Sequence, residues 1–227
     1  MGLFDIYKRG KKPEQKTAKE RKAQTEKYLK SISVPFIDHL PAIEEESEAR
    51  IRTPQEIARR IMVLIYLNYI AEEPDDKENV VDFLKQQGLW NSISNAEIEL
   101  FKNELTDQDK INISWRSEAI WILLWAINKV EKLELPIEQV EISKLLSLVP
   151  DFMADTNEFV ETATLRAVSE ILDISDLTYR LHWATRQADL DKLEKLRINE
   201  SIVEERHYAI NWVTCYDENW DNITTDT

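Results

Sequence analysis

The chain has 227 residues, 43% of them hydrophobic and 32% charged, and a formal net charge of −14. This composition is typical of one folded domain with a heavily charged surface and excludes a chain that is disordered throughout. Its three glycines, Gly2, Gly10 and Gly88, are too few for a glycine-rich phosphate loop, a dinucleotide-binding fingerprint or a sandwich of tight hairpins. The single cysteine, Cys215, excludes an intramolecular disulfide, so we expect a cytoplasmic protein.

The longest uninterrupted apolar run, residues 119–127, is nine residues long, less than half of the roughly 20 that cross a bilayer. We therefore expect no transmembrane segment. The charge is uneven, because Lys8–Lys30 holds ten basic and three acidic residues and leaves the rest of the chain strongly acidic. Such a body repels nucleic-acid phosphates and attracts basic proteins. We expect a basic protein partner and no nucleic acid bound to the body.

Residues 1–33 are predicted to form a basic, flexible N-terminal arm. Residues 3–7 are mostly apolar and precede a lysine-rich stretch. One interpretation is a mobile solubilising arm. The other is weak contact with a membrane surface or an acidic partner, because apolar residues beside lysines suit an interfacial segment. Residues 34–52 contain two prolines and are predicted to be an extended connector.

Residues 53–227 are predicted to form a single all-α domain, similar to a helical bundle, of about seven or eight helices. Thr53, Pro54 and Glu56 combine an N-cap, a proline at the first helical position and a capping box. Ser94 and Glu97 make a second capping box. The predicted helices cover about 53–70, 77–88, 94–105, 115–132, 142–148, 157–172, 174–188 and 201–216. The apolar run within 115–132 indicates the central helix of the core.

Two charged residues fall on apolar helix faces. At 100° per residue, Glu118 lies inside the apolar arc of the central helix and Arg206 inside that of the last helix. Unpaired burial costs on the order of several kcal/mol, so we expect Glu118 to pair with Arg206 or with another arginine such as Arg180. The alternative is a polar pocket of Glu118, Arg180, His182, Glu205 and Arg206 that binds an anionic ligand, with a buried carboxylate as acid or base.

The helix predicted over 174–188 places two aromatic residues away from its apolar face. Tyr179 and Trp183 lie four residues apart beside Arg186. A second helix or the C-terminal segment covers them in one interpretation. In the other, Tyr179, Trp183 and Arg186 form a contact surface, since aromatic residues and arginine are enriched at binding hot spots.

Metal and nucleophile signals are weak. Glu204 and His207 have the Glu-x-x-His spacing of di-iron bundles, but no second copy of the motif occurs, so we predict no metal and no cofactor. Cys215 lies near a helix end, without a helix N-terminus to lower its pKa, and no nucleophile motif surrounds it. These observations favour a noncatalytic protein over an enzyme.

Four segments carry a resemblance to a known family. They are Leu40-Pro41 through Arg52-Thr-Pro-Gln-Glu-Ile-Ala-Arg-Arg, Trp115-Arg-Ser-Glu-Ala-Ile-Trp-Ile-Leu-Leu-Trp-Ala, Asp176-Leu-Thr-Tyr-Arg-Leu-His-Trp-Ala and Glu205-Arg-His-Tyr-Ala-Ile-Asn-Trp. The closing Trp220-Asp-Asn-Ile-Thr-Thr-Asp-Thr also fits. Together they resemble a bacterial family known only as domain of unknown function 4272, from about residue 40 to the C-terminus and without the arm. The resemblance implies a bacterial helical protein and brings no activity, cofactor or catalytic residue.

These observations lead to one functional prediction and two alternatives. We predict a noncatalytic interaction protein of the bacterial cytoplasm whose acidic body binds a more basic protein, neutralisation of a toxin being one concrete form. The first alternative is an enzyme or small-molecule binder that acts on an anionic ligand through the Arg/Glu/His group. The second is a membrane-surface adaptor that works through the first dozen residues.

Overall fold

The computed structural model describes residues 15–191 and 196–227, and every regular element in these ranges is helical. The α-helices are α1 (Ala18–Ser31), α2 (Pro54–Glu72), α3 (Lys77–Gln86), α4 (Asn95–Lys102), α5 (Asp107–Ala126), α6 (Ile142–Leu146), α7 (Asn157–Glu161), α8 (Val168–Leu190) and α9 (Glu200–Val213). Short 3-10 helices are η2 (Pro74–Asp76), η3 (Trp90–Ser92) and η4 (Trp220–Asn222). The all-α prediction is confirmed, and the predicted seven or eight helices of residues 53–227 correspond to the eight α-helices α2–α9 among the described residues, with α1 in addition.

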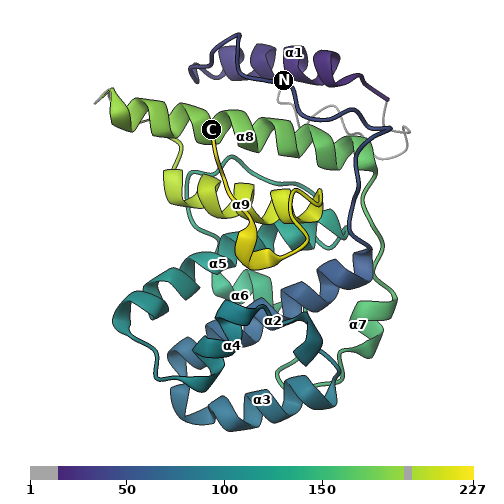
Figure 1. The fold of residues 1–227 in the computed structure, drawn as a ribbon, viewed down its shortest axis with the longest axis vertical. Coiled ribbons are helices and arrows are strands. Elements are labelled where there is room, and N and C mark those ends of the chain that lie inside the picture. The colour runs from purple at the N-terminus through teal and green to yellow at the C-terminus, as the bar shows by residue number, and fades with distance from the viewer. Residues whose placement is uncertain (1–14, 192–195) are drawn as a thin grey trace.

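The helices stack along the long axis of the molecule. Helix α5 packs between α2 and α9, α8 packs on α9, and α1 lies along α8 at one end of the stack (Figure 1). Helices α3, α4 and α7 contact α2 at the other end. Segments far apart in sequence therefore meet, and α8 and α9 lie next to each other in the half that also holds α1.

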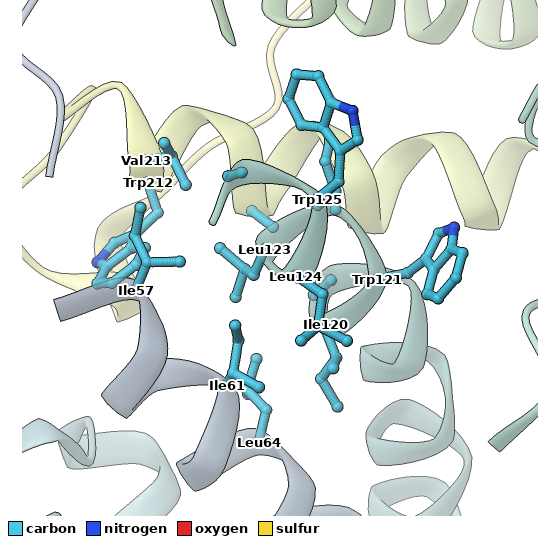
Figure 2. Packing of buried hydrophobic residues seen from close by; sticks show 14 of the residues in the cluster. Ile57, Ile61, Leu64, Ile120, Trp121, Leu123, Leu124, Trp125, Trp212 and Val213 are labelled. Atoms are coloured by element: carbon cyan, nitrogen blue, oxygen red, sulfur yellow. The ribbon is translucent and has the colours of Figure 1, made fainter. Parts of the chain in front are cut away.

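Helix α5 forms the centre of the core, as its apolar run predicts. All of its residues from 117 to 126 are buried, because α2 covers one side and α9 another. Figure 2 shows Leu123 and Leu124 directed towards the side chains of α2, whereas Trp121 and Trp125 point away from that helix. A helix that is apolar all round needs neighbours on every side, and the stack supplies them.

Capping boxes fix where the central helices begin. The Thr53 hydroxyl accepts a hydrogen bond from the Glu56 backbone N–H, and the Glu56 carboxylate accepts one from the Thr53 N–H, as predicted. Helix α5 begins at Asp107, eight residues before the predicted start, because Thr106 and Asp109 make the same box with aspartate at the third position. The sequence interpretation did not identify this capping box and placed the start of α5 too late.

The predicted division between residues 157–172 and 174–188 is wrong. Helix α7 ends at Glu161, and α8 runs without a break from Val168 to Leu190. The connection between them is fixed by Arg166, whose backbone N–H donates to the Ala126 carbonyl at 2.9 Å and whose Nε donates to the Trp125 carbonyl at 2.9 Å. This anchoring at the end of α5 places the break earlier than the sequence pattern suggested.

The flexible-arm prediction does not hold for Ala18–Ser31. This segment forms α1, which docks on α8 with Arg21 and Leu29 almost fully buried. The Arg21 Nε donates to the Asp173 carboxylate of α8 at 3.0 Å, so the basic residues predicted to be solvated partly serve as docking contacts. Residues 1–14, which carry the apolar part of the predicted arm and the membrane-contact hypothesis, lie outside the described ranges.

Residues 34–52 contain no helix, and their end is fixed to the C-terminal half. The Arg52 backbone N–H donates to the Val213 carbonyl at 3.0 Å, and its side chain donates to the carbonyl of Trp212. Across the residues that the structure describes, no helix combines the length and apolarity of a bilayer span.

Candidate functional site

A cavity of about 530 Å³ opens between the 41–50 segment, α8, α9 and the C-terminal segment. We name it the α8–α9 cleft. It is lined by Pro41, Ala42, Ile43, Glu44, Glu48, Ala49, Arg50, Ser175, Tyr179, His207, Asn211, Thr214, Cys215, Tyr216, Thr224 and Asp226. Small-molecule sites commonly have volumes of roughly 300–1,000 Å³, so the cleft is large enough to receive a small ligand or one side chain.

A pair of buried histidines joins the two helices beside this cleft. The Nδ1 atoms of His182 on α8 and His207 on α9 lie 3.0 Å apart, and the rings are nearly perpendicular. Burial lowers the pKa of His182 to about 4, with a contribution from the charge of Arg186. Burial lowers the pKa of His207 to about 3, with a contribution from His182. Both imidazoles are therefore neutral at pH 7, with one Nδ1–H donating to the other Nδ1.

Two tyrosines and a cysteine add to the cleft lining. The Tyr179 ring lies 5.8 Å from the His207 ring, and burial raises the pKa of its hydroxyl. Tyr216 is largely exposed. Cys215 follows α9 with a φ of 55°, a left-handed conformation that usually favours glycine. The Tyr216 N–H donates to the Asn211 carbonyl at 2.9 Å, which ends α9 with the hydrogen bond of a Schellman motif.

Exposed carboxylates surround the cleft. Glu44, Glu48 and Asp226 all belong to its lining, and none of them makes an ion pair with another residue in the described ranges. Arg50, a cation in the same lining, donates to the Glu218 carboxylate at 2.9 Å. The cleft thus combines exposed negative charge with aromatic rings.

The predicted pair of Glu118 and Arg206 is present in the core. Arg206 donates from Nε to Glu118 Oε2 at 2.9 Å and from Nη1 to the Glu134 carbonyl at 2.7 Å. The Val140 backbone N–H donates to Glu118 Oε1 at 2.6 Å, so both carboxylate oxygens are hydrogen-bonded. Burial lowers the pKa of the Arg206 guanidinium, and Glu118 offsets part of this effect. The two residues form a closed structural ion pair.

The other members of the predicted polar pocket lie elsewhere. Arg180 donates to Asp176 at 2.9 Å on its own helix and to the Pro41 carbonyl at 2.8 Å. His182 pairs with His207. The Oε2 of Glu205 is buried without a hydrogen-bond partner among the described residues, and burial raises the pKa of this carboxyl. The five predicted residues therefore divide among separate contacts and do not converge on one pocket.

The predicted contact surface is divided as well. Tyr179 enters the α8–α9 cleft, Trp183 is half-buried against the core, and Arg186 is exposed.

The sequence interpretation did not identify the pairing of His182 with His207, because helical spacing relates residues only within one helix. It also did not connect the acidic connector to this surface, although the run Glu44–Glu46 is visible in the sequence.

No group of three or more histidine, cysteine, aspartate or glutamate side chains could hold a metal ion within residues 15–191 and 196–227. Glu204 and His207, whose spacing resembles a metal motif, differ in their surroundings, since Glu204 is exposed and His207 is buried.

Comparison with known proteins leads to one family. No curated protein and no solved structure matches the chain. A family model described as domain of unknown function DUF4272 matches residues 21–223, which begins earlier than the resemblance seen from residue 40 and includes most of α1. The match spans the helical stack and the residues of α8 and α9 that line the cleft, so the chain belongs to the DUF4272 family.

Proposed function

We propose that the protein is a noncatalytic interaction protein of the bacterial cytoplasm and that the α8–α9 cleft receives a lysine or arginine side chain of a basic protein partner. The observation that carries the proposal is the exposed carboxylates of Glu44, Glu48 and Asp226 around a cavity of about 530 Å³. Carboxylates attract a cation, and the net charge of −14 raises the association rate of basic partners.

The interior of the cleft suits a cation that has lost part of its water. Tyr179 and Tyr216 belong to the lining, and aromatic rings attract ammonium and guanidinium groups by about 0.5–2 kcal/mol. The Arg180 guanidinium already lies 5.9 Å from the centre of the Tyr179 ring. Because the pKa of His207 is about 3, its imidazole carries no charge at pH 7 and does not repel the incoming cation. The Arg50 guanidinium, a cation in the lining, donates a hydrogen bond to the Glu218 carboxylate, so its charge is paired.

The same groups are poorly suited to acid–base or nucleophilic catalysis at neutral pH. A histidine with a pKa of about 3 is a weak general base at pH 7. Burial raises the pKa of the Cys215 thiol, which keeps it protonated and weakly nucleophilic. Arg206 and Glu118 are bonded to each other and to backbone groups, which disfavours the alternative of an enzyme or binder that uses them on an anionic ligand.

Binding of a fluorescent hexalysine peptide tests the proposal. The triple variant Glu44→Gln/Glu48→Gln/Asp226→Asn removes the carboxylates and keeps the shape of the cleft. Exposed ion pairs contribute about 0.2–1 kcal/mol each, so the loss of three should raise the Kd at low salt about 3-fold to 150-fold. Fluorescence anisotropy at two salt concentrations measures the Kd, and hexaglutamate, a peptide of opposite charge, is the control.

A matched variant separates the cleft from the general acidity of the surface. Asp82, Glu131 and Glu158 are exposed and do not line the cleft, and Asp82→Asn/Glu131→Gln/Glu158→Gln removes the same amount of charge. We expect it to weaken hexalysine binding much less than the cleft variant does. Equal losses in the two triple variants, or hexalysine binding that the cleft variant leaves unchanged, would contradict the proposal.

A further inference from the structure

A second cavity, of about 480 Å³, lies between α2, α5, α6 and the segment that follows α6. We name it the α2–α6 cavity. It is lined by Met62, Ile65, Tyr66, Asn68, Tyr69, Ala71, Glu72, Lys110, Ser114, Ile120, Ile142, Leu145, Leu146, Pro150, Asp151 and Phe152. It shares no lining residue with the α8–α9 cleft, so its role is independent of the function proposed above.

Apolar side chains line the α2–α6 cavity both in its buried part and at its mouth. Met62 and Ile120 are almost fully buried. At the mouth, Ile142, Leu146 and Phe152 are 47%, 51% and 51% exposed. Large apolar side chains that gather at a cavity mouth mark binding sites, because a ligand removes them from water.

Aromatic contacts hold one wall of this cavity in place. The Phe152 ring lies 4.2 Å from the Tyr69 ring and 5.7 Å from the Tyr66 ring. The next residue, Met153, has a φ of 58°, and its backbone N–H donates to the Tyr66 hydroxyl at 3.0 Å. A left-handed methionine stores backbone strain that its surroundings must offset. The wall is therefore preformed, and its aromatic rings suit a flat ligand.

The charged groups of the lining are two carboxylates and one ammonium. Glu72 and Asp151 are exposed carboxylates. The Asn68 amide nitrogen donates to the Leu64 carbonyl at 2.9 Å, which leaves its amide oxygen as an acceptor. Lys110 contributes the one ammonium in this lining, and two carboxylates outweigh it. The charge at the cavity thus favours a ligand with a positive group.

We propose that the α2–α6 cavity binds a small aromatic molecule that carries one ammonium group. The aromatic body is buried between Met62, Ile120 and the Phe152 wall, and the ammonium lies beside the carboxylates of Glu72 and Asp151.

Three probes with the same ring system test this proposal: 2-naphthylmethylamine, 2-naphthylmethanol and 2-naphthoate. Amide chemical shifts of the full chain give both the affinity and the place of binding. We expect the amine to bind at least about tenfold more tightly than the naphthoate, with the alcohol between them. The shifted amides should belong to α2, α5, α6 and residues 150–153.

Variants locate the binding. Ser114 is exposed on α5 and lines the cavity, so Ser114→Leu fills it and should abolish binding of the amine. Ser147 is exposed and does not line it, so Ser147→Leu is the control and should bind the amine like the wild type. Glu72→Gln/Asp151→Asn should reduce the preference for the amine over the alcohol to less than about twofold.

Several results would overturn the proposal. These are no binding of the amine, equal or tighter binding of the naphthoate, and binding that Ser114→Leu leaves intact. An amphipathic helical peptide that binds the cavity while the three naphthyl probes do not would assign the surface to a protein partner instead. The hexalysine measurement is separate, so failure of one proposal is distinguishable from failure of the other.

Discussion

Replacing Arg206 with methionine is expected to destabilise the fold by about 3–5 kcal/mol. The change removes the hydrogen bonds from Arg206 to Glu118 and to the Glu134 carbonyl, at 2.9 Å and 2.7 Å. Glu118 has no exposed surface. Its carboxylate would keep only the bond from the Val140 backbone N–H, so the variant contains a buried charge without its counterion.

The double variant Glu118→Leu/Arg206→Met separates loss of pairing from loss of packing. It removes both charges and leaves the Val140 N–H and the Glu134 carbonyl without these partners, at a cost of about 1–3 kcal/mol each. We expect it to be no less stable than Arg206→Met. Because Glu118→Leu alone should cost about 3–5 kcal/mol by leaving Arg206 without its counterion, the coupling energy between the two positions is then at least about 3 kcal/mol. Urea unfolding, with m-values compared across the variants, measures this energy. A loss below about 1 kcal/mol in Arg206→Met, or additive losses, would refute the reasoning.

Three further predictions test the surrounding structure. Burial holds the pKa of His207 at about 3, below the ordinary histidine value of about 6.5, so the unfolded chain binds more protons between these values and stability falls as the pH falls. Between pH 7 and pH 5 the wild type should lose about 2 kcal/mol more than His207→Gln in urea unfolding, whereas parallel curves would contradict this. Cys215→Gly should raise stability by about 0.5–1 kcal/mol, because glycine adopts the φ of 55° without strain, and a lower unfolding midpoint would exclude this relief. Arg21→Ala should speed hydrogen exchange in α1 and leave α5 protected; equal effects on both helices would show that α1 does not open by itself.

Local sequence signals predicted the elements whose cause is local. The capping box at Thr53 and the apolar run of α5 each specify a helix without knowledge of its neighbours. The pairing of Glu118 with Arg206 was also predictable, because an apolar helical arc implies burial and a buried charge requires a partner.

Other features depend on contacts between distant segments. Asp173 lies inside α8 and accepts hydrogen bonds from Lys16 and Arg21 of the N-terminal segment, and no pattern within α8 indicates these partners. The His182–His207 pair likewise requires the relative position of two helices. The α8–α9 cleft was not predicted because its acidic side comes from residues 41–50, which have no helical periodicity to orient them.

The position of α5 between α2 and α9 has a consequence for synthesis. A ribosome releases α2 and α5 long before α9, so the face of α5 that α9 covers stays exposed to water while the 73 residues between these two helices, from Ile127 to Asn199, are made. The hydrogen bond from the Arg52 backbone N–H to the Val213 carbonyl also forms only after Val213 has been synthesised. Nascent chains of this protein should therefore expose an aggregation-prone apolar surface that holdase chaperones bind until α9 emerges from the ribosome. Final compaction should follow release of the C-terminal segment.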